Sequence, residues 1–220
     1  MITNEEFIEA TKKFDEIEKR GSFYNMAVDL IKSHFEIEAY FLILATWNFA
    51  AFRYAVKDFD INLFKEKIVE LNAHFERFRD ETFRTINFER YKDDIKKIYD
   101  VLSSFAGVKY TGASKIMHLK NRAVFVMWDG YMKRDKPRKY YDKLDIVQKG
   151  DWKVRKYGDS AIGYIRFLMD MQSKFKSISF QEDNKTFAKA IDEFNYVKIT
   201  IPIQNMEKEE KNKKGRSSRS

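Results

Sequence analysis

The chain has 220 residues and no cysteine, which excludes disulfides, thiolate catalysis, iron–sulfur clusters and cysteine zinc sites. Hydrophobic residues make up 44% and charged residues 35%, so the chain has enough apolar material for a core and is not globally disordered. Its 42 Lys and Arg residues outnumber 34 Asp and Glu residues, a net charge of +8. This excess favours a polyanionic partner, such as nucleic acid or an acidic membrane surface.

The remaining counts narrow the fold class and the location. Eight Gly and two Pro residues are typical of an α-rich fold, and three His residues make a histidine-rich metal site unlikely to form, so no metal or cofactor is expected. The start of the chain is acidic and polar, unlike a secretory signal. The most apolar stretch, residues 39–51, is shorter than the about 20 residues that span a bilayer. We therefore expect an intracellular protein without a membrane segment.

Hydrophobic spacing predicts five helices in the first half of the chain. They cover residues 3–21, 22–35, 36–57, 60–78 and 88–105. Thr3 or Asn4, Ser22 and Asp60 are the expected N-caps. The helix over 36–57 is apolar on nearly every face, so we predict that it is the central helix, surrounded by the others.

The second half of the chain has a different sequence pattern. The sequence predicts a short helix over 111–120, an apolar strand-like run over 124–128 that ends at Asp129, and helices over 159–175 and 184–194, capped by Asp159 or Ser160 and by Asn184. Residues 196–203 alternate as a β-strand does, and Pro202 restricts such a strand to an edge. From Glu207 onward the chain has no apolar residue and is expected to be a disordered basic tail.

Residues 105–134 carry a recognisable motif. The hairpin is FAGVKYTGA over 105–113, an apolar helix follows, and the run VFVMWD over 124–129 ends in an acid that opens the next helix. This segment resembles the helix-hairpin-helix signature of the endonuclease III superfamily of DNA glycosylases. Asp129-Gly130 followed by the basic pair Lys133-Arg134 is similar to the adenine-specific branch.

The resemblance implies a mainly all-α, two-lobed fold of one domain over residues 1–206, with at most a short β element near the C-terminus. An N-terminal bundle over about 1–104 would face the hairpin segment and the C-terminal helices over 135–206, with the active cleft between them. The implied partner is double-stranded DNA, with no obligate protein partner. The implied location is cytoplasmic or nucleoid-associated.

The chemistry of such a site follows from its parts. Backbone N–H groups of a hairpin and a helix N-terminus bind a DNA phosphate without reading sequence. A nucleotide is then extruded into a pocket, where a carboxylate stabilises positive charge at C1′ and orients or deprotonates a water. By resemblance Asp129 is that carboxylate; the alternative is that Asp129 is an ordinary N-cap of a helix that starts at Gly130.

Two departures from the family pattern matter. Bifunctional members carry a Schiff-base lysine eighteen positions before the Asp, and that position here is Thr111, which implies a monofunctional enzyme that uses water. Lys115, one helical turn later on the same face, is an alternative amine. Lys109 replaces the second hairpin glycine, so it needs a positive φ or a remodelled turn. The expected DNA contacts are Gly107, Lys109, Thr111, Lys115, Lys133 and Arg134.

Other candidate features have two interpretations each. Trp47 and Asn48 lie where family members carry gap-filling or pocket residues; the alternative is a buried Trp and an Asn bonded to a neighbouring helix. His118 is expected to be a partly buried neutral imidazole. Residues 133–156 have ten basic and four acidic residues, a net charge of +6, with interleaved aromatic residues. This segment either tracks DNA or is a solvated face.

The sequence thus supports three hypotheses. The first is a monofunctional DNA N-glycosylase that removes a damaged, mismatched or modified base by Asp-assisted attack of water at C1′. The second is a non-catalytic DNA-binding protein on the same scaffold. The third is an RNA-binding or membrane-surface-binding helical protein that uses its charge alone.

Overall fold

The computed structural model describes residues 2–133, 135–153, 155–182 and 185–217. Over these ranges the chain is helical or irregular and has no strand, which confirms the predicted all-α class. The helices are α1 Asn4–Ile17, α2 Gly21–Lys32, α3 Glu36–Trp47, α4 Phe49–Ala55, α5 Ile61–Glu76, α6 Lys92–Ser104, α7 Lys109–Lys120, α8 Arg138–Tyr141, α9 Asp145–Gln148, α10 Ala161–Lys174, α11 Phe187–Asn195 and α12 Ile201–Ser217. A 3₁₀ turn, Val56–Asp58, follows α4, and a π-helix, Tyr196–Thr200, connects α11 to α12.

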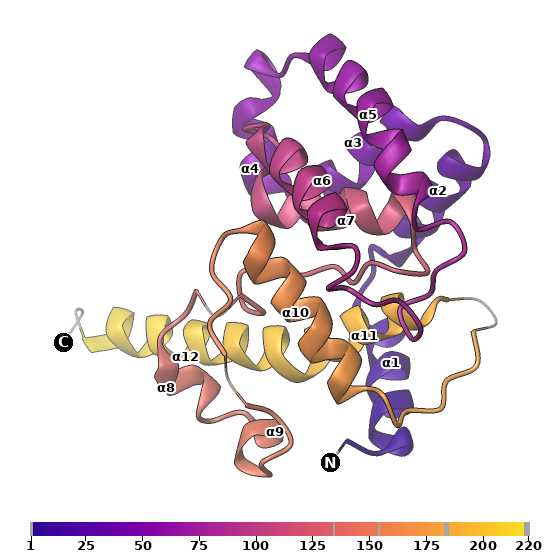
Figure 1. The fold of residues 1–220 in the computed structure, drawn as a ribbon. Coiled ribbons are helices and arrows are strands. Elements are labelled where there is room, and N and C mark those ends of the chain that lie inside the picture. Colours follow the sequence, from indigo (N-terminus) through magenta and orange to yellow (C-terminus); the bar gives the residue numbers. More distant parts are fainter. Residues whose placement is uncertain (1, 134, 154, 183–184, 218–220) are drawn as a thin grey trace.

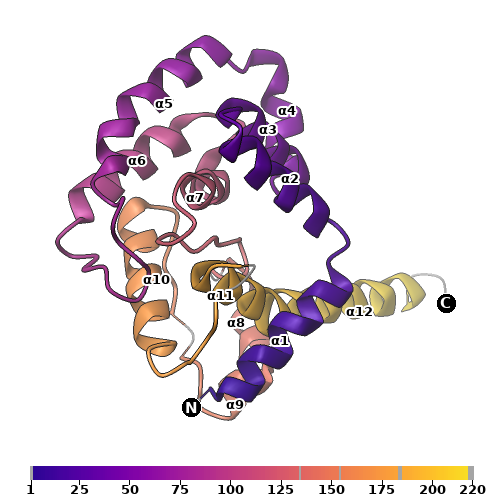
Figure 2. The ribbon, with the colours of Figure 1, turned by 90° about the vertical axis from the view of Figure 1, so that its right-hand side faces the viewer.

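The helices form two groups. Helices α2 to α7 lie together in the upper part of Figure 1, and α1 lies with α8 to α12 in the lower part. Within the first group α7 is central: Figure 2 shows it nearly end-on, and it contacts α2, α3 and α6. Residues 112–119 of α7 are all buried. A helix buried on every side shows little amphipathic periodicity, so its sequence pattern gave no sign of its central position.

The prediction that residues 36–57 form one central helix is wrong. The helix is interrupted at Asn48, so that α3 ends at Trp47 and α4 begins at Phe49. Helix α4 has no buried residue, although its sequence is rich in aromatic side chains. The interruption has a physical cause, because the Asn48 side chain hydrogen-bonds to the hairpin before α7 and this fixes the chain direction at that point.

We expected helix α1 to belong to an N-terminal bundle over 1–104, but it does not. It packs on α11 and the π-helix, where the Phe7 ring lies 5.4 Å from that of Phe175 and 5.6 Å from that of Phe194. Burial of these large rings stabilises the packing of α1 on α11, although α2 is the next helix in sequence. The C-terminal helices are therefore tied to the N-terminus.

The predicted N-caps are partly confirmed. Thr3 caps α1 in a capping box with Glu6, Asp60 caps α5, and Ser160 caps α10. Ser22 is not a cap, because α2 already begins at Gly21 and has no side-chain cap. Two further differences concern boundaries: α6 begins at Lys92 rather than at 88, and Thr186 caps α11, whereas Asn184 lies outside the described residues.

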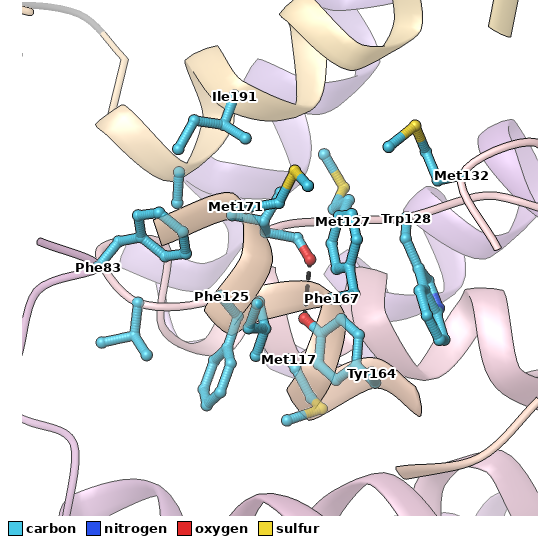
Figure 3. Packing of buried hydrophobic residues seen from close by; sticks show 14 of the residues in the cluster. Phe83, Met117, Phe125, Met127, Trp128, Met132, Tyr164, Phe167, Met171 and Ile191 are labelled. Carbon is cyan, nitrogen blue, oxygen red and sulfur yellow. Dashed lines mark hydrogen bonds between the residues drawn. The ribbon is translucent and has the colours of Figure 1, made fainter. Parts of the chain in front are cut away.

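The run over 124–128 is extended and buried but pairs with no strand among the described residues. Side chains satisfy its backbone instead: the Tyr164 hydroxyl of α10 donates to the Val126 carbonyl at 2.8 Å (Figure 3). The Trp128 N–H donates to Ser114 Oγ of α7 at 3.3 Å. The run therefore crosses between the two groups of helices and ends at Asp129.

The predicted β-strand over 196–203 is wrong. Residues 196–200 form a π-helix, and α12 continues from it. Pro202 lacks an N–H and cannot donate to the carbonyl four residues earlier, so a regular α-helical ladder is interrupted here. The wider π turn absorbs this interruption. Val197 and Ile199 remain buried, so the alternation in the sequence reports burial without a strand.

The disordered tail expected from Glu207 is also wrong, because α12 extends to Ser217. Two of its acidic residues pair with the basic segment: Lys136 Nζ lies 2.9 Å from Glu207 and Lys139 Nζ 2.7 Å from Glu210. The Tyr140 hydroxyl donates to Glu210 at 2.8 Å. Figure 1 shows the end of α12 projecting away from the other helices past α8. Charge pairing rather than apolar burial holds this helix against α8.

His118 joins three segments of the core. Its Nδ1 lies 2.6 Å from the Phe125 carbonyl and its Nε2 2.7 Å from the Tyr24 hydroxyl. A carbonyl only accepts, so Nδ1 carries the proton, and Tyr24 donates to Nε2. Burial lowers the pKa of His118 to about 4. The prediction of a neutral imidazole agrees with this environment, although His118 is completely buried rather than partly buried.

His118 should make the protein acid-labile. The folded pKa is lowered from about 6.5, so the stabilisation is complete above pH 6.5 and is lost as the pH falls toward 4, amounting to about 3 kcal/mol. We expect His118→Gln to be less stable at pH 7 and to lose this part of the pH dependence, measured by urea unfolding from pH 7.5 to 4. The exposed His34, replaced by Asn, is the control, and an unchanged slope in His118→Gln contradicts this assignment.

Candidate functional site

The hairpin before α7 is held by one side chain. Asn48 Nδ2 donates to the Gly107 carbonyl at 3.1 Å and to the Val108 carbonyl at 2.9 Å, and its Oδ1 accepts from the Thr111 hydroxyl at 2.9 Å. Asn48 is buried, so all of its polar groups face the hairpin. Gly107 is closely packed: a Cβ there would lie 3.2 Å from ring atoms of Phe52 and Phe59, so a side chain requires these rings to shift by a few tenths of an ångström.

Lys109 has a left-handed backbone conformation. Its φ is +51°, and its side chain is exposed. The resemblance implied a positive φ or a remodelled turn at this position, and the φ is positive, so the lysine accepts the strain of this conformation. Helix α7 starts at Lys109, so this cationic residue stands at a helix N-terminus.

A pocket of about 250 Å³ lies where the two groups of helices meet. One wall comes from α2, α3 and α7 and the other from α1, α11, the π-helix and α12, with Asp129 and Tyr131 between them. Its polar lining residues are Arg20, Lys115, Asp129, Lys189, Asp192, Thr200 and Gln204, and its rings are Phe14, Tyr24, Trp47, Trp128, Tyr131 and Tyr196. The pocket thus combines charged groups with aromatic faces.

Asp129 is half-buried in this pocket and accepts two hydrogen bonds. The Met132 N–H donates to Oδ1 at 2.9 Å, and the Thr200 hydroxyl donates to Oδ2 at 2.7 Å. Burial raises the pKa of Asp129, opposed by these two hydrogen bonds and by the charge of Lys115. Asp129 therefore caps a turn, since no helix starts at Gly130 in the described part of the chain, and it also lines the pocket. Its catalytic role stays a prediction.

We expected Lys115 to contact a DNA phosphate. It lies in the pocket wall instead of on the surface, so it is not placed to do so. It is 6% exposed, and its Nζ lies 3.4 Å from the Thr111 carbonyl and 3.5 Å from the Trp128 carbonyl. The cause is the complete burial of α7, which turns this side chain toward the junction of the helix groups. Burial lowers the pKa of Lys115.

Trp47 lines the pocket, but Asn48 does not, because its amide is directed at the hairpin. The guanidinium of Arg20 lies 5.5 Å from the Trp47 ring centroid, within cation–π range. Arg20 also forms an ion pair with Glu18 at 2.6 Å. The Trp47 indole, held beside the Arg20 guanidinium, therefore offers a flat apolar face at the edge of the pocket.

Lys133 is buried too and is not available to DNA. It pairs with Asp135 at 3.2 Å and with Asp159, and it lies 5.8 Å from the Tyr110 ring. Arg134 lies outside the described residues. Other cations of the basic segment are also paired with acids beyond it, including Lys136, Lys139 and Arg155. Much of the segment's net charge is therefore neutralised within the fold.

Several pocket residues had no signal in the sequence. Lys189 and Asp192 lie on α11, and Thr200 lies on the π-helix, all at least 60 positions from Asp129 in the chain. No spacing rule connects them to the motif, because tertiary packing alone brings them together. The alternation of residues 196–200 predicts a strand, whereas the structure has a π-helix there.

The described residues contain no cluster of three or more His, Asp or Glu side chains arranged to hold a metal ion. Nor does any helix in those ranges have the length and apolar character needed to cross a membrane. Comparison with known proteins finds no matching family model, curated protein or solved structure.

The left-handed turn gives a stability prediction. We expect Lys109→Gly to be about 1 kcal/mol more stable than Lys109→Ala, since both remove the charge but only glycine is unstrained at a φ of +51°. Urea unfolding of the two variants measures the difference. Equal stabilities, or a more stable Ala variant, would show that the turn is not left-handed at this position.

Proposed function

We propose that this chain binds duplex DNA and removes a base by hydrolysis of the N-glycosidic bond. The observation that carries the proposal is the position of Asp129, a carboxylate in a ring-lined pocket at the junction of two helix groups. The hairpin and Asp129 are connected through α7, since Trp128 bonds to both Ser114 and Tyr110 of that helix. A phosphate held at the hairpin would therefore have a fixed position relative to Asp129.

The hairpin supports DNA binding by its geometry. Lys109 in the left-handed region keeps the turn that a glycine would form, and it adds an exposed positive charge. The first-turn N–H groups of α7 and this charge suit one phosphate oxygen pair, with no reading of base identity. The second lobe of the family fold would correspond to the group of α1 and α8 to α12.

The pocket supports extrusion of a single base. Its volume of about 250 Å³ lies below the roughly 300–1,000 Å³ of pockets for drug-sized ligands, so it suits one ring system. Aromatic faces such as Trp47 and Tyr131 offer stacking partners, worth about 1–3 kcal/mol per base. The ionised Asp129 would stabilise the positive charge that develops at C1′ and would accept a proton from the attacking water.

Thr111 stands where bifunctional members of the suspected family carry their lysine, and its hydroxyl is bonded to Asn48. In the proposed reaction Thr111 therefore supports the hairpin, and water is the nucleophile. The proposal assigns the chain to base excision repair or to defence against modified DNA, in the cytoplasm or at the nucleoid.

The alternative is a DNA-binding protein on the same scaffold without the chemistry. The observation that favours it is that both carboxylate oxygens of Asp129 already accept a hydrogen bond within the protein. Such bonds leave fewer lone pairs for water and sugar. Exposure of Asp129 to the pocket favours the enzyme, because a purely structural cap does not need an adjacent cavity.

The test is base release from duplexes that carry uracil, 8-oxoguanine opposite adenine, an alkylated base or a hypermodified base. We expect release from at least one of them and a loss of about 100-fold or more in Asp129→Asn, because the amide has no charge and no basic oxygen. Since the pKa of Asp129 is raised, the rate should fall on acidification at a higher pH than for an ordinary aspartate.

Asp142→Asn, which removes an exposed carboxylate paired with Arg138, is the matched control and should keep full activity. A stable analogue of an abasic site in the duplex separates the two hypotheses. Strong preference for this duplex supports the enzyme, whereas equal binding to intact duplex, together with no base release from any substrate, leaves the DNA-binding protein. Absence of any DNA binding at low salt contradicts both.

A further inference from the structure

Helix α4 carries aromatic side chains that the core does not use. It lies at the margin of the first group of helices and has no buried residue (Figures 1 and 2). Phe49 is 55% exposed and Tyr54 is 72% exposed, and Val56 in the following 3₁₀ turn is 52% exposed. Exposure of large apolar groups to water is unfavourable. Several such groups on one element indicate a surface that binds a partner.

The two exposed rings lie beside one cation. The Arg53 guanidinium lies 5.4 Å from the Phe49 ring centroid and 4.4 Å from that of Tyr54, and it donates a hydrogen bond to the Tyr54 hydroxyl. Among the described residues no carboxylate lies within ion-pair distance of Arg53. We call Phe49, Arg53 and Tyr54 the α4 surface. It presents aromatic faces together with a positive charge that no acid of the described chain neutralises.

An open cleft of about 480 Å³ lies between α4 and the hairpin. Tyr54 lines it together with Lys109 of the hairpin. The rings of Phe59 and Phe105 also line the cleft, with centroids 5.7 Å apart. Because the Asn48 side chain bonds to two carbonyls of the hairpin, the start of α4 is held in place and the cleft is formed before any ligand binds.

We propose that the α4 surface and this cleft bind single-stranded nucleic acid. Unpaired bases would stack on Tyr54 and Phe49, and the flanking phosphates would pair with Arg53 and Lys109. Stacking on aromatic faces beside cations suits unpaired bases of any identity, since every base has a flat π face and every nucleotide a phosphate. The proposal shares only Lys109 with the proposed duplex contact, and the pocket of Asp129 takes no part in it.

Charge and shape favour this partner over a second copy of the chain and over a lipid surface. Around the cleft the exposed cations Arg53, Lys57 and Lys109 outnumber Asp58 and Asp60, and the Asp60 carboxylate already accepts two N–H groups of α5. A symmetric contact between two copies would bring like charges together. A lipid surface contacts projecting rings but leaves a recess empty, whereas a planar base can enter it.

The experiment is fluorescence anisotropy with a labelled oligothymidylate, an oligouridylate of the same length and a matched duplex, at low salt. We expect saturable binding of at least one single strand. Tyr54→Ala should bind it at least about 10-fold more weakly, because stacking of one base contributes a factor of about 5 to 150 to affinity. Tyr54→Phe keeps the ring and should bind within about twofold of the unmodified protein. Comparison of the two strands shows whether the surface prefers deoxyribose or ribose.

Phe35→Ala is the matched control. Phe35 is also an exposed ring, at 54%, but it stands at the start of α3, whereas α4 follows the other end of that helix. This variant should bind the single strands as tightly as the unmodified protein does. Urea unfolding should show that both alanine variants are folded, since neither ring is buried. Equal losses of affinity in Phe35→Ala and Tyr54→Ala contradict a specific role for the α4 surface.

Three results overturn the proposal: no binding of either single strand, single-strand binding that Tyr54→Ala leaves unchanged, and binding of the duplex alone. Vesicles that contain phosphatidylserine and sedimentation equilibrium test the other occupants. If Tyr54→Ala abolishes vesicle binding or self-association and leaves single-strand binding unchanged, the surface belongs to a lipid or to a second copy.

The outcome is separate from that of the proposed function. Base release from a duplex without any single-strand binding overturns this inference and leaves the proposed function intact. Single-strand binding that depends on Tyr54, with no base release from any substrate, supports this inference and contradicts the proposed enzyme.

Discussion

The hydrogen bonds of the Asn48 carboxamide are the interaction on which the site depends. They interrupt the helix that would otherwise continue from α3 and hold the Gly107 and Val108 carbonyls. With Lys109 fixed in a left-handed turn, α7 enters the first group of helices in one orientation. Because α7 is buried on all sides, that orientation sets the direction of every side chain along it.

Each turn of α7 then contributes to a different part of the molecule. Its N-terminus presents the hairpin, Ser114 and Lys115 support the Trp128 backbone and the pocket, and His118 links the helix to α2 and to the extended run. The pocket exists because this run ends at Asp129 between the two helix groups. Burial there acts on three ionisable groups in different ways: it raises the pKa of Asp129, lowers that of Lys115, and for Lys189 is outweighed by two carboxylates.

The sequence predicted those features that depend on local chemistry. The all-α class and the caps at Thr3, Asp60 and Ser160 follow from residue type and short spacing. The resemblance implied a positive φ or a remodelled turn at Lys109, and the φ there is positive. Features that depend on tertiary packing were missed. Lys115 and Lys133 look like surface cations until burial and ion pairs are known, and the pocket wall from α11 and the π-helix has no sequence spacing to Asp129. The charged composition of α12 also led to the wrong prediction of a disordered tail, because its acidic residues pair with the basic segment.

Under the proposed function, α7 couples a phosphate-binding hairpin to a base-sized pocket. A crystal structure of the protein bound to a duplex with an abasic-site analogue is the decisive measurement. We expect a phosphate within hydrogen-bond distance of the backbone at residues 107–111 and the extruded sugar between Asp129 and Lys115. DNA bound on another face, or an unstacked nucleotide that leaves this pocket empty, would contradict it.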